Sequence, residues 1–151
     1  MELRDILLLL HIAAAGTWLG ANLMQAVVPS MAAKQGPETV AGWYRVTGRL
    51  AGPIYIPAGV VLLATGIWMV LINDAYSFST GFVTIGFAVI IIGALLGKFV
   101  FESGSERAAA AIESGDQGRI KAAAGRLAAF GTLDTLLVLF TIFAMILRLG
   151  A

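Results

Sequence analysis

The sequence contains no cysteine, and this absence removes several kinds of site at once. Without thiols the chain cannot form a disulfide, a thiolate metal site, an iron–sulfur cluster or the thioether links of a c-type haem. It also has a single histidine, His11. A metal bound by this chain must therefore be held by that histidine, by methionine, by carboxylates or by backbone groups.

Charged residues are scarce as well. They make up only 13% of the chain, against 59% hydrophobic residues, and the formal net charge is +1. Such a weak charge cannot create the basic field that nucleic-acid binding needs, so no nucleic-acid partner is expected. The mean hydropathy of +0.90 instead predicts a protein whose main partner is the lipid bilayer.

Long apolar stretches are what the sequence has in abundance. Each is near the ~20 residues that a helix needs to cross ~30 Å of hydrocarbon. They cover residues 6–28, 53–72, 82–101 and 130–147. Because lipid requires every backbone polar group to be satisfied internally, all four are predicted to be helices. The predicted fold is all-α, a polytopic bundle of four transmembrane helices in one domain over residues 1–151.

The 102–129 connector is the longest and most polar segment between these stretches. It holds one Ala-rich run that follows Ser105 and ends at Gly115, and a second that follows Asp116. Serine and aspartate favour helix starts, and glycine favours helix ends. We therefore predict two short interfacial or cytoplasmic helices in this connector.

Basic residues are distributed unequally between the two sides of the predicted bundle. The connectors 32–52 and 102–129 hold seven of them, whereas Arg4 and Arg148 are the two on the opposite side. Because cytoplasmic loops carry an excess of Lys and Arg, both long connectors are predicted to be cytoplasmic. Both chain termini are then outside the cell.

His11 is the most distinctive residue because it lies inside the first apolar stretch, about 9 Å from its outer end. Trp18 and Asn22 continue its helical face, and Met69 and Met145 are expected at its depth on other helices. One imidazole with two thioethers suits Cu(I), and a His–Met pair also holds haem iron. We predict His11, Met69 and Met145 as ligands of copper or haem b, with Trp18 and Asn22 beside the cofactor.

Two other interpretations of His11 remain open at this point. A neutral histidine can donate its proton to a nearby acceptor and be purely structural, and methionine commonly fills gaps in cores. The chain then binds no cofactor. In the second interpretation, His11 has a proton-handling role, in which the imidazole binds and releases protons.

Lys98 and Asp134 each lie about one turn inside the cytoplasmic end of an apolar stretch. A direct pair, with Asn22 or Gln25 nearby, would offset the cost of burying either charge. The alternative is that Lys98 extends to the headgroups while Asp134 caps the fourth helix. In both cases this layer is separate from His11.

Gly16 and Gly20 form a small-residue pattern that lets helices approach closely. It predicts a homo-oligomer, attachment to a larger membrane complex, or packing against a helix of the same chain.

Several motifs spread over nearly the whole chain. Residues 10–20 read LHIAAAGTWLG, Gly-Pro follows at 52–53, TGIW at 65–68 and GTLD at 131–134. The chain resembles an uncharacterised family of small bacterial integral membrane proteins with four helices, which opens with LHxxxAxxWxGG. This family is similar in style to CopD-like copper-resistance proteins and HemJ-type protoporphyrinogen oxidases. The resemblance implies a four-helix fold in the bacterial inner membrane and no assigned activity. The N-out and C-out orientation comes from the distribution of basic residues.

The HemJ-type likeness concerns particular residues. Those proteins pair a first-helix histidine with a tryptophan seven residues later, a spacing that His11 and Trp18 match. They also have a functional lysine in a later helix, for which Lys98 is the candidate.

The predicted function is therefore that of a membrane protein that binds haem b or copper for electron transfer or cofactor handling. One alternative is a non-enzymatic accessory or assembly subunit of a larger membrane complex. Another is a small oligomeric transporter. Hydrolysis and group transfer are not expected, because no acid–base dyad, nucleophile motif or phosphate-binding loop is present in the sequence.

Overall fold

The computed structural model describes residues 2–151, and within that range it contains helices and turns but no strand. The helices are α1 (Leu3–Ala33), α2 (Pro37–Thr47), α3 (Ile56–Leu71), α4 (Gly81–Leu96), α5 (Ser103–Ser114) and α6 (Gln117–Ile146). Two π-helical segments join them, η1 (Ala51–Tyr55) before α3 and η2 (Gly97–Glu102) between α4 and α5. The predicted all-α fold is confirmed.

Four continuous helices are long and apolar enough to cross a membrane. They are Leu3–Ala33, Ala51–Leu71, Gly81–Ser114 and Gln117–Ile146, with lengths of 31, 21, 34 and 30 residues. Their positions match the four apolar stretches of the sequence. The polytopic four-helix prediction is therefore confirmed.

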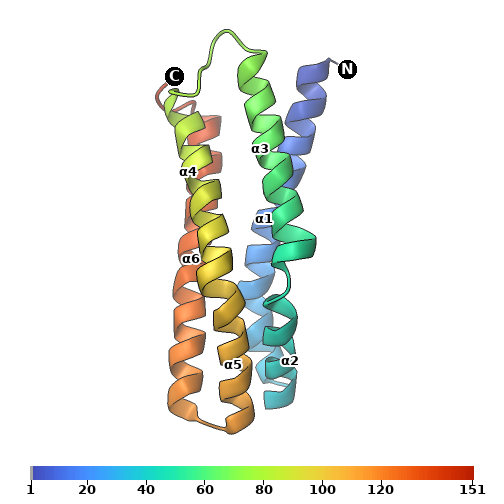
Figure 1. Ribbon diagram of the computed structural model, residues 1–151, viewed down its shortest axis with the longest axis vertical. Helices are drawn as coiled ribbons and strands as arrows, with labels where there is room; N and C mark the ends of the chain where they lie inside the picture. Colours follow the sequence, from blue (N-terminus) through green and yellow to red (C-terminus); the bar gives the residue numbers. More distant parts are fainter. Residues whose placement is uncertain (1) are drawn as a thin grey trace.

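Three of the four helices are longer than the bilayer requires. At 1.5 Å per residue, the 34-residue helix is about 51 Å long, well beyond ~30 Å of hydrocarbon. Figure 1 shows both termini and the α3–α4 loop at one end of the bundle, here called the termini end. The α1–α2 and α5–α6 turns lie at the other, the hairpin end, where α2 stands below the shorter α3.

Each helix packs against particular neighbours in the bundle. α1 packs against α3 and α6, α4 against α6, and α5 against α2 and α6. At the hairpin end an ion pair between Arg45 of α2 and Glu113 of α5 spans that contact. Large apolar side chains such as Leu71 and Ile146 cover the outer faces near the termini end, at 69% and 73% exposure. Those faces suit contact with lipid.

The two short helices predicted in the 102–129 connector need one correction. α5 is the first of them, but it begins at Ser103 and continues from α4 through η2, and Ser105 is buried rather than capping. The second is the beginning of α6 and not a separate helix. The reason is that no proline separates its Ala-rich run from the apolar stretch that follows, and isolated glycines such as Gly125 cost a helix only about 1 kcal/mol each. The other two predicted caps are confirmed, with Gly115 at φ +68° and Asp116 accepting from the Arg119 amide.

Candidate functional site

Asp134 is a carboxylate buried in the middle of the bundle, with only 2% of its surface exposed. Its Oδ2 accepts a hydrogen bond from Trp18 Nε1 at 3.1 Å and another from Asn22 Nδ2 at 2.7 Å. Both donors lie on α1 four residues apart, so they share one helical face and reach the same oxygen. These bonds join α1 to α6 across the core.

The hydrogen bonds continue from Asn22 to η1. The Tyr55 hydroxyl donates to Asn22 Oδ1 at 2.8 Å, and Gln25 Nε2 donates to the Tyr55 oxygen. The Tyr55 ring also meets the Trp18 indole edge-on, with centroids 5.4 Å apart. Every donor in this series of hydrogen bonds points toward Asp134, so the successive bond dipoles reinforce one another at the carboxyl group. We call Trp18, Asn22, Gln25, Tyr55 and Asp134 the Asp134 network.

Two glycines make room for the indole of Trp18. A Cβ atom at Gly93 of α4 would lie 2.5 Å from Trp18 Cζ2 and 3.3 Å from Asp134 Oδ1. On α3, a Cβ atom at Gly59 would lie 3.4 Å from Trp18 Cζ3. The indole is therefore held between two helices by close approach to their backbones. Asp134 Oδ1 has no hydrogen-bond partner among the described residues.

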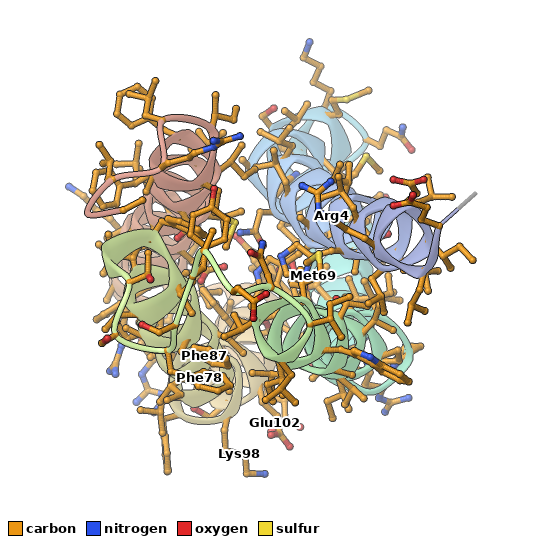
Figure 2. The ribbon with its side chains drawn as sticks, turned by 90° about the horizontal axis from the view of Figure 1, so that it is seen from above. Arg4, Met69, Phe78, Phe87, Lys98 and Glu102 are labelled. Carbon is orange, nitrogen blue, oxygen red and sulfur yellow. The ribbon has the colours of Figure 1, made fainter. Side chains whose placement is uncertain are left out.

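The predicted pair between Lys98 and Asp134 is wrong. Lys98 Nζ lies 2.9 Å from Glu102 Oε2, one turn along the same helix, and both side chains extend away from the bundle in Figure 2. Asp134 also does not cap a helix, because α6 begins at Gln117 and places it well inside. The donors that Asp134 Oδ2 meets are instead the neutral side chains of Trp18 and Asn22. The predicted nearness of Asn22 to Asp134 is confirmed.

His11 lies in a second polar layer, closer to the termini end. Its Nδ1 is 2.8 Å from Thr65 Oγ1 on α3, and the Thr65 hydroxyl lies 2.6 Å from the Val61 carbonyl oxygen. Since the hydroxyl donates its one hydrogen to that carbonyl, it must accept from His11 Nδ1–H. The lone pair of the imidazole is then on Nε2. A Cβ atom at Gly66 would lie 3.5 Å from His11 Cε1, so the ring rests against α3.

The two methionines occupy different helix contacts. Met69 lies one turn beyond Thr65 on α3, is half-buried, and is directed toward the middle of the bundle in Figure 2. Met145 of α6 places its Cε 2.9 Å from where a Cβ atom would stand on Gly86 of α4. Among the described residues there is no group of three or more His, Cys, Asp or Glu side chains arranged to hold a metal.

The structure thus divides the predicted site residues between two layers. Trp18 and Asn22, expected beside the cofactor, belong to the Asp134 network rather than to the His11 layer. Sequence reasoning missed Tyr55 and Thr65. The only signal for Tyr55 was a hydroxyl-bearing aromatic between two prolines, which names no partner, and Thr65 appeared only as part of a motif.

A cavity of about 420 Å³ adjoins the Asp134 network on its hairpin side. Asn22 and Gln25 line it, and no charged side chain contributes to its wall. Its hydroxyl-bearing lining residues are Tyr44, Thr47, Ser105, Thr132 and Thr135. Burial raises the pKa of the Tyr44 phenol, which keeps it protonated and able to donate a hydrogen bond. The network therefore has one face toward the core and one toward this cavity.

Four membrane-length helices around a buried polar core define a polytopic helical integral membrane protein. The model of one family, described as "Predicted integral membrane protein (DUF2269)", matches residues 5–149. The chain belongs to this family, which confirms the resemblance to small four-helix membrane proteins. No curated protein and no solved structure matches the chain.

Proposed function

We propose that this integral membrane protein binds a copper ion or haem b through His11, for electron transfer or cofactor handling. The observation that supports the proposal is the hydrogen bond between His11 Nδ1 and Thr65 Oγ1. Metal-ligating histidines commonly donate their other ring N–H to a fixed acceptor, which orients the ring and sets the tautomer. Here that arrangement leaves the Nε2 lone pair for the cofactor.

Copper fits the surroundings of His11 better than haem does within one chain. The imidazole rests against Gly66, and His11 does not line the cavity beside the Asp134 network. A Cu(I) ion needs only point contacts from soft ligands, and Met69 offers a thioether from the same helix as Thr65. Met145 would have to leave Gly86 to take part. A haem would have to lie at the surface of the bundle, with a second copy of the chain supplying the opposite ligand.

The proposed location is the bacterial inner membrane with both termini outside. The hairpin end carries seven basic residues, against Arg4 and Arg148 at the termini end, and such an excess marks the cytoplasmic side. His11 then lies in the outer half of the bundle, where bound copper or haem would exchange electrons with partners outside the cytoplasm.

The test is an absorption spectrum with elemental analysis on protein purified from membranes in mild detergent. We expect copper, or a haem Soret band, in the native protein and its loss in His11→Ala. Thr65→Val removes the acceptor for Nδ1–H while keeping the shape of the side chain. It should therefore weaken cofactor retention by about 10–100-fold.

Thr141→Val is the matched control, because Thr141 Oγ1 donates only to the Leu137 carbonyl of its own helix. It should retain the cofactor as the native protein does. A native protein with neither copper nor a Soret band, or a His11→Ala protein with an unchanged spectrum, would contradict the proposal.

A second candidate is an accessory subunit that packs on other membrane proteins or on a second copy through α1. The observation that favours it is that Cβ atoms at Gly16 and Gly20 would meet nothing within 4 Å. These glycines therefore do not pack on a helix of the same chain, and they leave a smooth strip for another helix. The same purification distinguishes the candidates. A colourless, metal-free protein that co-purifies with a defined membrane partner favours the subunit role.

A further inference from the structure

A groove of about 510 Å³ runs between α5 and α6 at the hairpin end. Its lining comes from one face of each helix and includes many small side chains. Four of the lining residues are alanines, Ala110, Ala111, Ala122 and Ala123. Because alanine leaves space that a larger side chain would fill, the two helices pack here without closing the surface between them.

Three arginines line this groove, and no acidic side chain does. Among the described residues Arg107 and Arg126 form no ion pair, since Arg107 donates to Ser103 Oγ at 2.8 Å and Arg126 lies over the Phe130 ring. The third, Arg119, pairs with Asp116 at 3.2 Å. The groove is therefore a positively charged hollow with two guanidinium groups that have no carboxylate to neutralise them.

The acidic residues of the neighbouring turns are directed elsewhere. Glu113 pairs with Arg45 of α2, on the other side of α5. Glu102 pairs with Lys98 on the outer surface. Glu106 is exposed and does not line the groove.

The groove lies where the membrane surface meets the bundle. Arg126 is one turn before Phe130, at which the apolar stretch of α6 begins, and Leu133 is one further turn along the same face. Leu133 is 44% exposed. An amphiphile with its head among the arginines would therefore have an apolar helix face directly above it for its chains.

We propose that this groove binds the phosphate headgroup of an anionic phospholipid from the leaflet at the hairpin end. Guanidinium groups match phosphate oxygens with paired hydrogen bonds, and basic pockets between membrane helices favour anionic headgroups. The charge of the groove, the small side chains in its lining and the apolar helix face beside it all fit that one ligand. The site is independent of His11 and of any cofactor.

The experiment measures lipid retention by native mass spectrometry of the full chain, taken from micelles that contain equal amounts of phosphatidylglycerol and phosphatidylcholine. The native protein is expected to retain phosphatidylglycerol in preference to phosphatidylcholine. Each arginine near an anionic surface is worth about a fivefold change in binding, so Arg107→Gln/Arg126→Gln should lower retention by about 25-fold. Both side chains are exposed, and circular dichroism melting checks that the variant is folded.

The matched control is Arg49→Gln/Lys121→Gln, which removes the same charge from exposed positions at the hairpin end outside the groove. It should retain phosphatidylglycerol within about twofold of the native protein. Equal losses in the two double variants would overturn the proposal, because surface potential alone would then explain the binding. So would equal retention of both lipids by the native protein. If the double variant melts early, Arg126→Gln alone must still show the fivefold loss.

A further arm adds inorganic phosphate to the micelles as the competing anion. Retention of phosphatidylglycerol that is unchanged by phosphate supports a lipid as the occupant. Displacement of the lipid by phosphate at matched concentration would overturn the proposed lipid site, because the groove would then bind a free anion.

Discussion

Asp134 shows how a single side chain can organise the interior of a membrane bundle. A carboxyl group away from water is costly unless its oxygens are satisfied. Two donors of α1 satisfy Oδ2, while Oδ1 has no partner among the described residues. The same bonds satisfy the indole N–H of Trp18 and one amide hydrogen of Asn22. Removing the carboxyl group would therefore leave two buried donors without an acceptor, which costs more than losing a solvent-exposed hydrogen bond.

The close approach of Gly93 to the Trp18 indole can be tested by adding a single methyl group. In Gly93→Ala the new methyl group would lie 2.5 Å from Trp18 Cζ2, so the indole must shift from the position in which it donates to Asp134 Oδ2. We expect a loss of about 1–3 kcal/mol in the free energy of unfolding, with a shift in tryptophan fluorescence as the indole leaves Asp134. Reversible unfolding in detergent, followed by far-ultraviolet circular dichroism, measures the change.

Gly97→Ala is the control for this substitution. Gly97 is one turn further along the same continuous helix, and a Cβ atom there meets nothing within 4 Å. Its unfolding free energy should stay within about 1 kcal/mol of the native value or rise, because alanine favours a helix over glycine. Equal losses in both variants would contradict the packing of Trp18 against Gly93.

At the scale of elements, the turn between α5 and α6 is built from two adjacent residues with different tasks. Gly115 adopts φ +68°, which L residues with a side chain rarely do, and ends α5. Asp116 then begins α6 by accepting from the Arg119 amide through Oδ1 at 3.0 Å. This abrupt reversal lets two long helices run antiparallel with the groove between them.

Gly115→Ala should cost about 1 kcal/mol of unfolding free energy, because alanine must adopt the left-handed conformation. Gly118→Ala, three residues later and inside α6, should instead be neutral or stabilising by up to about 1 kcal/mol. Thermal melting of both variants in the same detergent measures the difference. A Gly115→Ala protein as stable as Gly118→Ala would mean that the turn does not have the described backbone.

At the scale of the whole molecule, the unequal distribution of basic residues makes the proposed orientation testable. Since the chain has no cysteine, single cysteines can be introduced without removing any. Ser79→Cys lies in the loop at the termini end and Ser114→Cys at the hairpin end, and both positions are exposed. A membrane-impermeant maleimide should label Ser79→Cys in intact spheroplasts and Ser114→Cys only after permeabilisation.

Each single-cysteine variant serves as the control for the other, because both must be labelled once the membrane is opened. The reverse pattern would place the hairpin end outside. In that case His11 lies in the cytoplasmic half, and the proposed electron exchange outside the cytoplasm would be wrong.

Much of the fold could be predicted from the sequence because lipid restricts it strongly. An apolar stretch of membrane length has to be a helix, so the four spans and their order followed from hydropathy alone. The caps at Gly115 and Asp116 were also predictable, since they depend on residues that are neighbours in the chain. The continuity of α4 with α5 could not be predicted in this way, because it depends on packing between α5, α2 and α6 at the hairpin end.

The site was predictable only in part. Helical periodicity placed Trp18 and Asn22 on one face, but periodicity cannot say which residue of another helix that face meets. Because Lys98 and Asp134 lie at a similar depth in the membrane, they were expected to pair. The rotation of the helix that carries Lys98 instead directs this side chain outward to Glu102. The same limit applies to His11, whose observed partner Thr65 lies 54 positions away in sequence.

Hydropathy along the chain is enough to predict a membrane protein with four spanning helices, because the cost of unsatisfied backbone in lipid leaves no other conformation for its apolar stretches. Composition likewise shows that the chain has no thiol and no second imidazole. The hydrogen bonds of Asp134 with Trp18 and Asn22, and of His11 with Thr65, are seen only in the folded bundle. Such pairings depend on the rotation and depth of one helix relative to another, which side-chain packing sets and no local pattern records.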